Sequence, residues 1–223
     1  MFARLRFVSQ LAMVFQPLRF ALLISAGLGF VLVGLPLPAT GQADLRSSFP
    51  GRKVGGGTRG ECSARILAHL VPDSSVFAPG NSAELALVQG PTANPVSLTM
   101  TFKPQSGGTP VSRALQASPA ALILFKGATI AAPTVWESGF DCAAGDGGVS
   151  NDPLAFIETA SPPALSLLVP TPDSTDAPIQ NALKTLRRSC GATVPAAATL
   201  AQFGLADVVT AEWPQQLPVR CPS

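Results

Sequence analysis

His69 is the only histidine in this 223-residue chain, and tyrosine is absent. Any mechanism in which an imidazole activates a serine or a cysteine would therefore depend on His69. The residue lies in an apolar run that is typical of a strand, and no Gly-x-Ser-x-Gly turn marks a nucleophilic serine. We predict a partly buried, structural histidine, and metal ligation by His69 is the alternative.

Acidic side chains around one loop form a second candidate group. Asp141, Asp146 and Asp152, with Glu137 nearby, are the densest set of carboxylates in the chain. Calcium prefers several oxygen ligands on flexible loops, although this spacing differs from that of an EF-hand. Hydrolysis by paired carboxylates would need two acids placed across a cleft, which the sequence does not indicate. We expect a solvated loop, with a calcium site at the three aspartates as the alternative.

A glycine-rich stretch at residues 55–60 fits the dinucleotide-binding pattern Gly-x-Gly-x-x-Gly. That pattern functions only between a strand and a helix N-terminus, whereas here a basic stretch precedes it and a predicted strand follows it. A weaker alternative is an anion nest of backbone amides with an adjacent cation. Its residues would be Gly55, Gly56, Gly57 and Arg59. We expect instead that the glycines let the chain turn tightly into the first strand.

Four cysteines, Cys62, Cys142, Cys190 and Cys221, allow three sets of two disulfides. None forms a C-x-x-C motif, and a single histidine cannot complete a Cys2His2 zinc site. The simplest pairing is Cys62–Cys142 with Cys190–Cys221, because each bridge then stays inside one predicted region. In this pairing Cys62 pins the glycine-rich stretch to the strand that carries Trp136. Buried free thiols are the alternative.

Composition and charge bound the fold and the partners. Apolar residues make up 47% of the chain, with 22 Pro, 20 Gly and only 13% charged residues, which favours short strands and many turns. From Ile66 onward there are seven basic and eleven acidic residues. No basic face with interleaved aromatic residues is present, so we predict no nucleic-acid partner.

The first 43 residues have the layout of a secretory signal. Residues 1–20 carry three arginines and no acid, residues 21–35 are uncharged, and Gly41 and Ala43 place small residues before a cut after Ala43. We expect export to the periplasm or the cell exterior, where disulfides are stable. If the segment is retained, residues 21–35 would anchor the protein to the inner membrane, and membrane contact is expected only through this segment.

The remaining chain is predicted to start with a basic, glycine- and serine-rich linker over residues 44–60. A mainly β domain follows over residues 61–170. Residues 96–103 alternate strictly between apolar and polar, residues 133–142 alternate again, and residues 120–125 are a continuous apolar run. Further short strands are expected at 64–71, 84–88, 154–159 and 164–169. We predict an antiparallel β-sandwich, Ig-like in the loose sense, with Trp136 in its core.

The pattern changes at residue 171, where a small helical appendage over residues 171–223 is predicted. Asp176 precedes Pro178 as at a helix start, and the apolar residues that follow have helical spacing up to Cys190. A further helix is expected to open at residues 193–195. Residues 214–223 are predicted to be an extended tail that Cys190–Cys221 ties to the first helix, with Trp213 sealing the appendage against the sandwich.

The sequence GGGTRGEC at residues 55–62, followed by an apolar strand that ends in Leu-Val-Pro at 70–72, resembles an uncharacterised family of exported cyanobacterial proteins. Members of that family share a Gly-Thr-Arg-Gly-x-Cys motif and a β-rich domain in which a strand carries Trp before a second Cys. Trp136 and Cys142 fit that feature. The family's early aromatic-rich segment is replaced here by residues 77–80, and the C-terminal half is shorter. The resemblance implies an exported location and a β-rich fold, and it implies no activity.

Taken together, these patterns favour an exported, non-enzymatic binding or structural module of the cell envelope. We predict no cofactor, and we expect the partner to be another envelope protein or a glycan. The alternative is an envelope hydrolase without a recognisable motif. That alternative would gain from a structure in which His69 meets a carboxylate in an open cleft.

Overall fold

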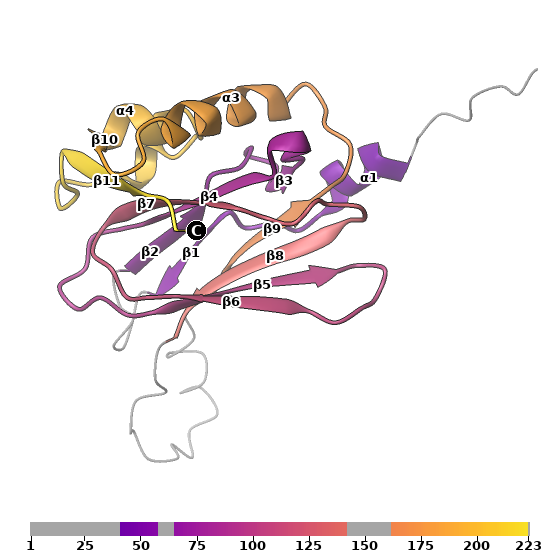
Figure 1. Cartoon of the computed structure of the whole chain (residues 1–223), viewed down its shortest axis with the longest axis horizontal. Helices are drawn as coiled ribbons and strands as arrows, with labels where there is room; N and C mark the ends of the chain where they lie inside the picture. The colour runs from indigo at the N-terminus through magenta and orange to yellow at the C-terminus, as the bar shows by residue number, and fades with distance from the viewer. Residues whose placement is uncertain (1–40, 58–64, 142–161, 223) are drawn as a thin grey trace, which may run out of the picture. The chain divides into compact units, whose positions relative to one another are not determined.

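The computed structural model of the protein describes residues 41–57, 65–141 and 162–222, all within one compact unit, Ala39–Ser223. Two β-sheets and a layer of helices make up this unit (Figure 1). The helices cover the outer face of one sheet, and the other sheet packs against its inner face. The prediction of a mainly β, sandwich-like domain with a small helical part is confirmed.

The first sheet has six strands in the order β1-β2-β4-β7-β11-β10. All neighbours are antiparallel except β7 and β11, which are parallel. Its strands are β1 (Val54–Gly57), β2 (Arg65–His69), β4 (Glu84–Gln89), β7 (Ala121–Lys126), β10 (Thr193–Pro195) and β11 (Gln216–Arg220).

The second sheet has five strands in the order β3-β9-β8-β5-β6. It is antiparallel apart from the parallel pair β3 and β9, and β6 forms one edge. Its strands are β3 (Val76–Phe77), β5 (Leu98–Pro104), β6 (Val111–Leu115), β8 (Thr134–Phe140) and β9 (Ala164–Leu168).

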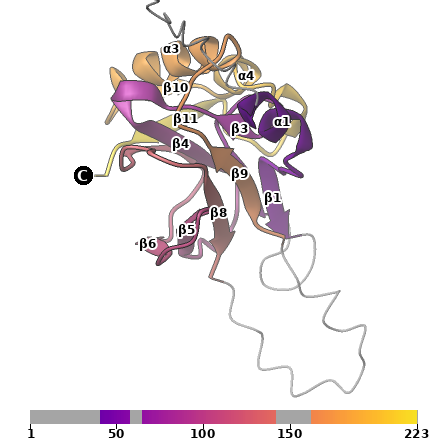
Figure 2. The same ribbon diagram turned by 90° about the vertical axis from the view of Figure 1, so that its right-hand side faces the viewer.

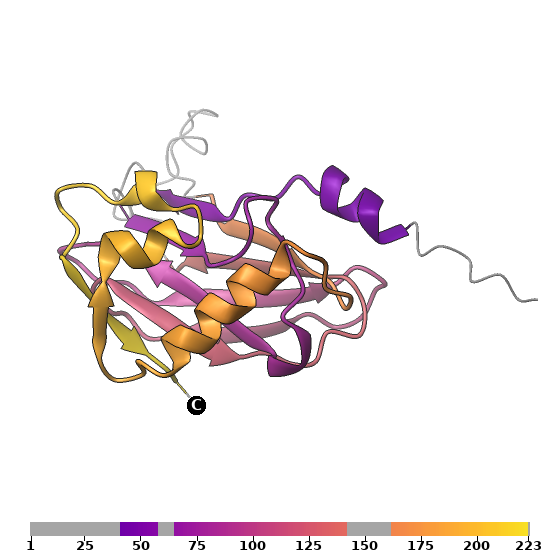
Figure 3. The ribbon, with the colours of Figure 1, turned by 90° about the horizontal axis from the view of Figure 1, so that it is seen from above.

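The helical layer lies over the first sheet, where α3 packs on β4 and β7 (Figure 3). Its longest member is amphipathic, with Ile179, Leu183 and Leu186 buried at helical spacing. The helices of the described chain are α1 (Gly41–Ser48), η2 (Gly80–Ser82), α3 (Asp176–Arg187), α4 (Ala196–Ala201) and η3 (Ala206–Val208). Among the described residues, no helix is both long and apolar enough to cross a membrane.

The layers explain two different sequence patterns. Strands β4 and β7 are covered on both faces, by helices on one side and by the second sheet on the other, so both are continuous apolar runs. Strands β5 and β8 belong to the outer sheet, and only alternate residues face the core. Trp136 on β8 is fully buried and contacts Phe102 and Phe125, as the alternation predicts.

Residues 44–57 differ from the flexible linker that the sequence indicates. Helix α1 covers part of this stretch, and β1 pairs with β2 from Val54↔Ala68 to Gly57↔Arg65. Glycines weaken a strand in isolation, but here the neighbouring strand supplies the pairing. The rest of the predicted linker lies outside the described residues, as do the predicted strand at 154–159, Cys62 and Cys142.

One side chain fixes α1 to the body of the protein. Arg46 donates to Asp176 Oδ2 at 2.6 Å and to the Thr171 carbonyl at 3.3 Å, and its Nε lies 3.0 Å from Asp173 Oδ2. Asp176 is fully buried and also accepts from the backbone amide of Ala78 at 3.1 Å. Figure 2 shows α1 beside β3, to which Ala78 is adjacent in sequence.

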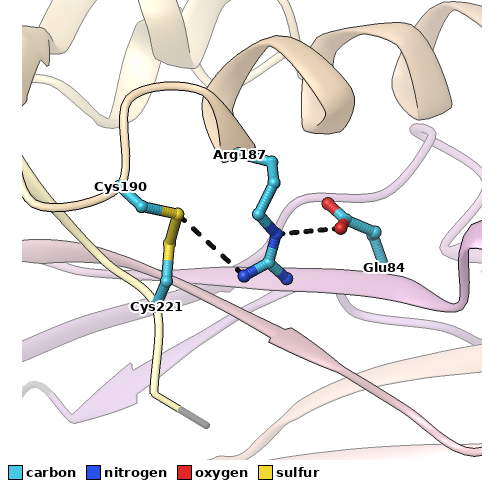
Figure 4. The surroundings of a disulfide bond; sticks show 4 residues. All are labelled: Glu84, Arg187, Cys190 and Cys221. Atoms are coloured by element: carbon cyan, nitrogen blue, oxygen red, sulfur yellow. Dashed lines mark hydrogen bonds and ion pairs between the residues drawn. A yellow bond between two sulfur atoms is a disulfide. The ribbon is translucent and has the colours of Figure 1, made fainter.

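The C-terminal segment is part of the sheet rather than a tail or a separate appendage. Residues 216–220 form β11 between β7 and β10, and residues 193–195 form β10. The helix predicted to open here follows at once as α4, with Pro195 at its N-cap. The disulfide Cys190–Cys221 is present as predicted (Figure 4). Beside it, Arg187 of α3 donates to Glu84 of β4 at 2.8 Å. Trp213 is buried in the main core, as expected.

Candidate functional site

His69 lies between the two sheets and bridges them. Its Nδ1 lies 2.8 Å from the Ser166 hydroxyl of β9, and its Nε2 lies 2.9 Å from the Ser138 hydroxyl of β8. The imidazole stacks on Trp136 with ring centroids 3.6 Å apart and planes 9° apart. All four side chains are completely buried. His69 is therefore more buried than the sequence indicates, and it is a structural link between the layers.

The surroundings of His69 keep its ring neutral. Burial lowers the pKa of His69 well below its ordinary value of 6.5. A neutral imidazole donates from one nitrogen and accepts at the other, so one serine accepts from the ring and the other donates to it. Both ring nitrogens bond to hydroxyl groups rather than to a carboxylate, and no side of the ring faces solvent. This arrangement lacks the oriented base and the open position that nucleophilic catalysis requires.

The glycine-rich stretch has a structural explanation in its described part. The Gly56 amide donates to the Pro162 carbonyl at 3.0 Å, so this amide is not available to an anion. A Cβ at Gly55 would lie 2.6 Å from the Pro163 carbonyl carbon and 2.7 Å from the Pro162 oxygen. Gly55 is therefore required because the segment that leads into β9 passes close to β1. Arg59 of the predicted anion nest lies outside the described residues.

The predicted calcium loop is described only at one end. Asp141 is exposed, and its backbone amide donates to the Ser97 carbonyl at 2.8 Å. Asp146 and Asp152 lie outside the described residues. Within residues 41–57, 65–141 and 162–222, no three His, Cys, Asp or Glu side chains are grouped so that they could hold a metal ion.

An apolar pocket opens on the side of the sandwich where β6 is the edge of the second sheet. Its volume is about 420 Å³, and we call it the apolar pocket. The segment between β7 and β8 closes one side through residues 127–132. Its remaining described lining comes from both sheets and comprises Leu85, Phe102, Pro104, Val111, Arg113, Phe125, Lys126 and Thr134.

Strand register decides which of these side chains point between the sheets. Leu85 lies opposite Phe125, and Val111 lies opposite Phe102, so each pair shares a face of its sheet. Phe102 and Phe125 contact one another edge to face, with centroids 6.5 Å apart, across the sandwich. All four side chains therefore project into the space between the sheets. Val111 nevertheless remains 64% exposed, and it is the one large hydrophobic residue of the described chain that is exposed.

A second cavity of about 400 Å³ adjoins the apolar pocket at Arg113, which lines both. We call it the arginine pocket. Its remaining described lining comes from β6, β7 and the end of the chain and comprises Ala114, Leu115, Gln116, Ile123, Arg220, Cys221 and Pro222. The guanidinium carbon of Arg113 lies 5.9 Å from the centroid of the Phe125 ring, which places the cation over an aromatic face.

Sequence reasoning did not predict this pair of cavities, because strand β6 itself was missed. Val111, Arg113 and Leu115 alternate with Ser112 and Ala114, which is the period of a strand. The charged side chain of Arg113, at the central inward position, obscures that pattern. An apolar–polar alternation with a cation at one inward position is the sequence signal that would have indicated β6 and its cavity.

Comparisons of the chain with protein-family models, curated proteins and solved structures found no match.

Proposed function

We propose that the protein is an exported, non-enzymatic binding module of the cell envelope, and that its ligand occupies the apolar pocket. The observation that carries this proposal is an opening between the two sheets, lined by Leu85, Phe102 and Phe125 and rimmed by exposed Val111. Ligand sites in proteins are typically cavities of about 300–1,000 Å³ lined by apolar and aromatic side chains with a few polar groups. The apolar pocket, at about 420 Å³, has this character.

The His69 cluster supports binding over hydrolysis. The single imidazole of the chain bonds to Ser138 and Ser166 in a fully buried position, and its partners include no carboxylate. The hydrolase alternative depends on a carboxylate-oriented histidine in an open cleft, and nothing in the described residues favours it. The apolar lining also favours a small apolar ligand over a glycan, whose hydroxyl groups would need polar partners.

The proposed location draws on the disulfide and on the leader-like composition of residues 1–43. Disulfides persist in exported compartments and are rare in a reducing cytosol, and Cys190–Cys221 joins α3 to the end of β11. Fractionation of cells, with thiol alkylation at the moment of lysis, tests this part. We expect the protein in the envelope fractions with Cys190 and Cys221 protected until reduction. Recovery from the cytosol with both cysteines alkylated would contradict it.

Binding is tested with an uncharged fluorescent probe, N-phenyl-1-naphthylamine, added to the full chain. We expect saturable binding to one site. Ala132 is partly buried and lines the apolar pocket, so Ala132→Trp adds a large ring there and should weaken binding about tenfold or more. Ala198→Trp is the matched control, because Ala198 is exposed on α4 and lines neither cavity.

Thermal unfolding of both variants confirms that they remain folded. Equal probe affinity in the wild type and in Ala132→Trp would show that the apolar pocket is not the binding site.

A further inference from the structure

We infer that the ligand is a soluble, single-chain anionic amphiphile: an apolar chain in the apolar pocket and a carboxylate or phosphate group in the arginine pocket. This inference rests on the proposed function, because it names the chemical class of the ligand of that site. Three features carry it: the inward cation at Arg113, the inward cation at Arg220 and the uncovered apolar surface at Val111.

Arg113 stands at the junction of the two cavities. It lies opposite Met100 in the β5–β6 register, and Met100 is fully buried. Arg113 therefore occupies a position on β6 that faces the core, between inward-facing Val111 and Leu115. Its guanidinium lies over the face of the Phe125 ring, which places the cation at the inner wall of both cavities.

Arg220 reaches the same space from the other sheet. In the parallel pair of β7 and β11, Arg220 lies beside Ile123, and both residues line the arginine pocket. Ile123 lies opposite Leu87, which lies opposite His69, so this row of residues faces the second sheet. Two arginines from different sheets thus line one cavity, and guanidinium groups bind carboxylate and phosphate through paired hydrogen bonds.

The charged side chains in the described lining of the two cavities are all basic. Their described lining contains Arg113, Arg220 and Lys126 and no aspartate or glutamate. Lys126 is opposite Glu84 in the β4–β7 register, and Glu84 bonds to Arg187 of α3, so Lys126 belongs to the helix-facing side. The inference therefore assigns the anion to Arg113 and Arg220 and leaves Lys126 out.

The apolar part of the ligand accounts for Val111. Val111 is 64% exposed and points into the apolar pocket. A ligand that covers this aliphatic side chain removes apolar surface from water, which favours binding. An inward charge on an edge strand also discourages edge-to-edge pairing of sheets, and this explains Arg113 by itself. It does not explain Arg220, because β11 has neighbours on both sides.

The occupant is a monomer in solution rather than a bilayer surface, since the apolar pocket lies between the sheets and not on a flat face.

The test uses dodecanoate and uncharged 1-dodecanol at micromolar concentration and pH 8, each displacing N-phenyl-1-naphthylamine from the full chain. We expect dodecanoate to bind about tenfold more tightly than dodecanol, a difference of about 1.4 kcal/mol. The preference should shrink as salt is raised.

The double variant Arg113→Gln/Arg220→Gln should reduce this preference to about twofold or less while dodecanol affinity is retained. The single variant Arg220→Gln changes only an exposed residue and gives a smaller loss in a chain that folds normally. Arg188→Gln removes the same charge from an exposed position at the end of α3 and should leave the preference unchanged.

The outcomes separate the two proposals. Equal affinity for dodecanoate and dodecanol would overturn the anionic ligand and leave the binding module standing. Failure of both compounds to displace the probe, with no effect of Ala132→Trp, would overturn the proposed function itself. Association with phosphatidylglycerol vesicles without displacement by monomeric dodecanoate would also overturn the inference.

Discussion

The imidazole of His69 lies flat on the indole of Trp136, with ring centroids 3.6 Å apart and planes 9° apart. The two residues come from different sheets, β2 and β8, and hydroxyl groups of Ser138 and Ser166 hold both ring nitrogens. Stacking fixes the plane of the ring, and the two serines fix its rotation within that plane. The residue that would carry out acid–base chemistry in another setting is here the polar centre of the sandwich.

Stability should fall as the pH falls through 6.5. The unfolded chain binds a proton at His69 with the ordinary pKa of 6.5, whereas burial lowers the pKa of His69 in the folded protein. Below pH 6.5 the unfolded state therefore holds more protons, and the free energy of unfolding decreases. We expect a loss of about 1.4 kcal/mol between pH 7.5 and 5.5, measured by urea unfolding.

The chain has a single histidine, so few other groups titrate in this window. The hydrogen bond from the Thr175 side chain lowers the pKa of Asp173 below its ordinary value of 3.8, so that group titrates at more acidic pH. His69→Gln should remove the dependence between pH 7.5 and 5.5. The His69 ring proton resonances of the folded wild type should also stay constant over this range. A titrating resonance would contradict the prediction.

Asp176→Ala should be strongly destabilising. The carboxylate is fully buried and accepts from Arg46 and from the backbone amides of Ala78 and Asp173. Its removal leaves a largely buried cation and the buried amide of Ala78 without this partner, a type of change that costs about 3–5 kcal/mol. Glu137→Ala is the control, because Glu137 pairs with Lys103 on the exposed face of the second sheet. That change should cost about 1 kcal/mol or less.

Denaturant unfolding of the two variants measures both costs. A loss for Asp176→Ala as small as that for Glu137→Ala would show that α1 is not held by the Arg46 contacts.

Two glycines should respond in opposite ways to substitution by alanine. A Cβ at Gly55 would overlap the backbone of residues 162–164, so Gly55→Ala should displace β1 or the start of β9 and cost about 2 kcal/mol or more. A Cβ at Gly139 would lie 3.7 Å from Pro163 Cβ, an ordinary contact. Gly139→Ala should therefore change stability by about 0.5 kcal/mol or less.

Hydrogen exchange locates these effects. Loss of amide protection confined to β1 and β9 in Gly55→Ala is the expected pattern, and unchanged protection in that variant would contradict the prediction.

The disulfide should contribute mainly through the unfolded state. Cys190 and Cys221 are 31 residues apart, and closing a loop of this length stabilises the folded state by about 3–4 kcal/mol in a chain-entropy estimate. The double variant Cys190→Ser/Cys221→Ser should lower the free energy of unfolding by about this amount and expose β11 to hydrogen exchange. Serine at both positions, rather than a reductant, keeps any bridge at Cys62 and Cys142 unaffected. Wild-type stability of the double variant would contradict the prediction.

The sequence predicts the strands whose environment repeats along the chain. Residues 96–103 and 133–142 alternate because one face is buried, and residues 120–125 are apolar throughout because β7 is covered on both sides. Strand β1 was missed because its glycines, which weaken strands, are there for the close passage at Gly55. Strand β6 was missed because Arg113 occupies an inward position.

The candidate site was less predictable than the fold. The partners of His69 are 69 and 97 residues away in sequence, and no local signal marks Ser138 or Ser166 as its neighbours. The same is true of Arg113 and Arg220, which line one cavity only after β6 and β11 have joined different sheets. Sequence periodicity predicts which face a side chain takes, whereas the long-range order of the strands decides what it meets there.

The order of strands in the first sheet also has a consequence for the timing of folding. β11 lies between β7 and β10, and it pairs in parallel with β7 near residue 122. Residues 216–220 emerge from the ribosome after every other strand described here, so the side of β7 away from β4 stays unpaired until then. An unpaired, apolar strand edge invites association with other chains. Slow synthesis of residues 216–220 would therefore prolong the stage at which this edge of β7 is open to such association.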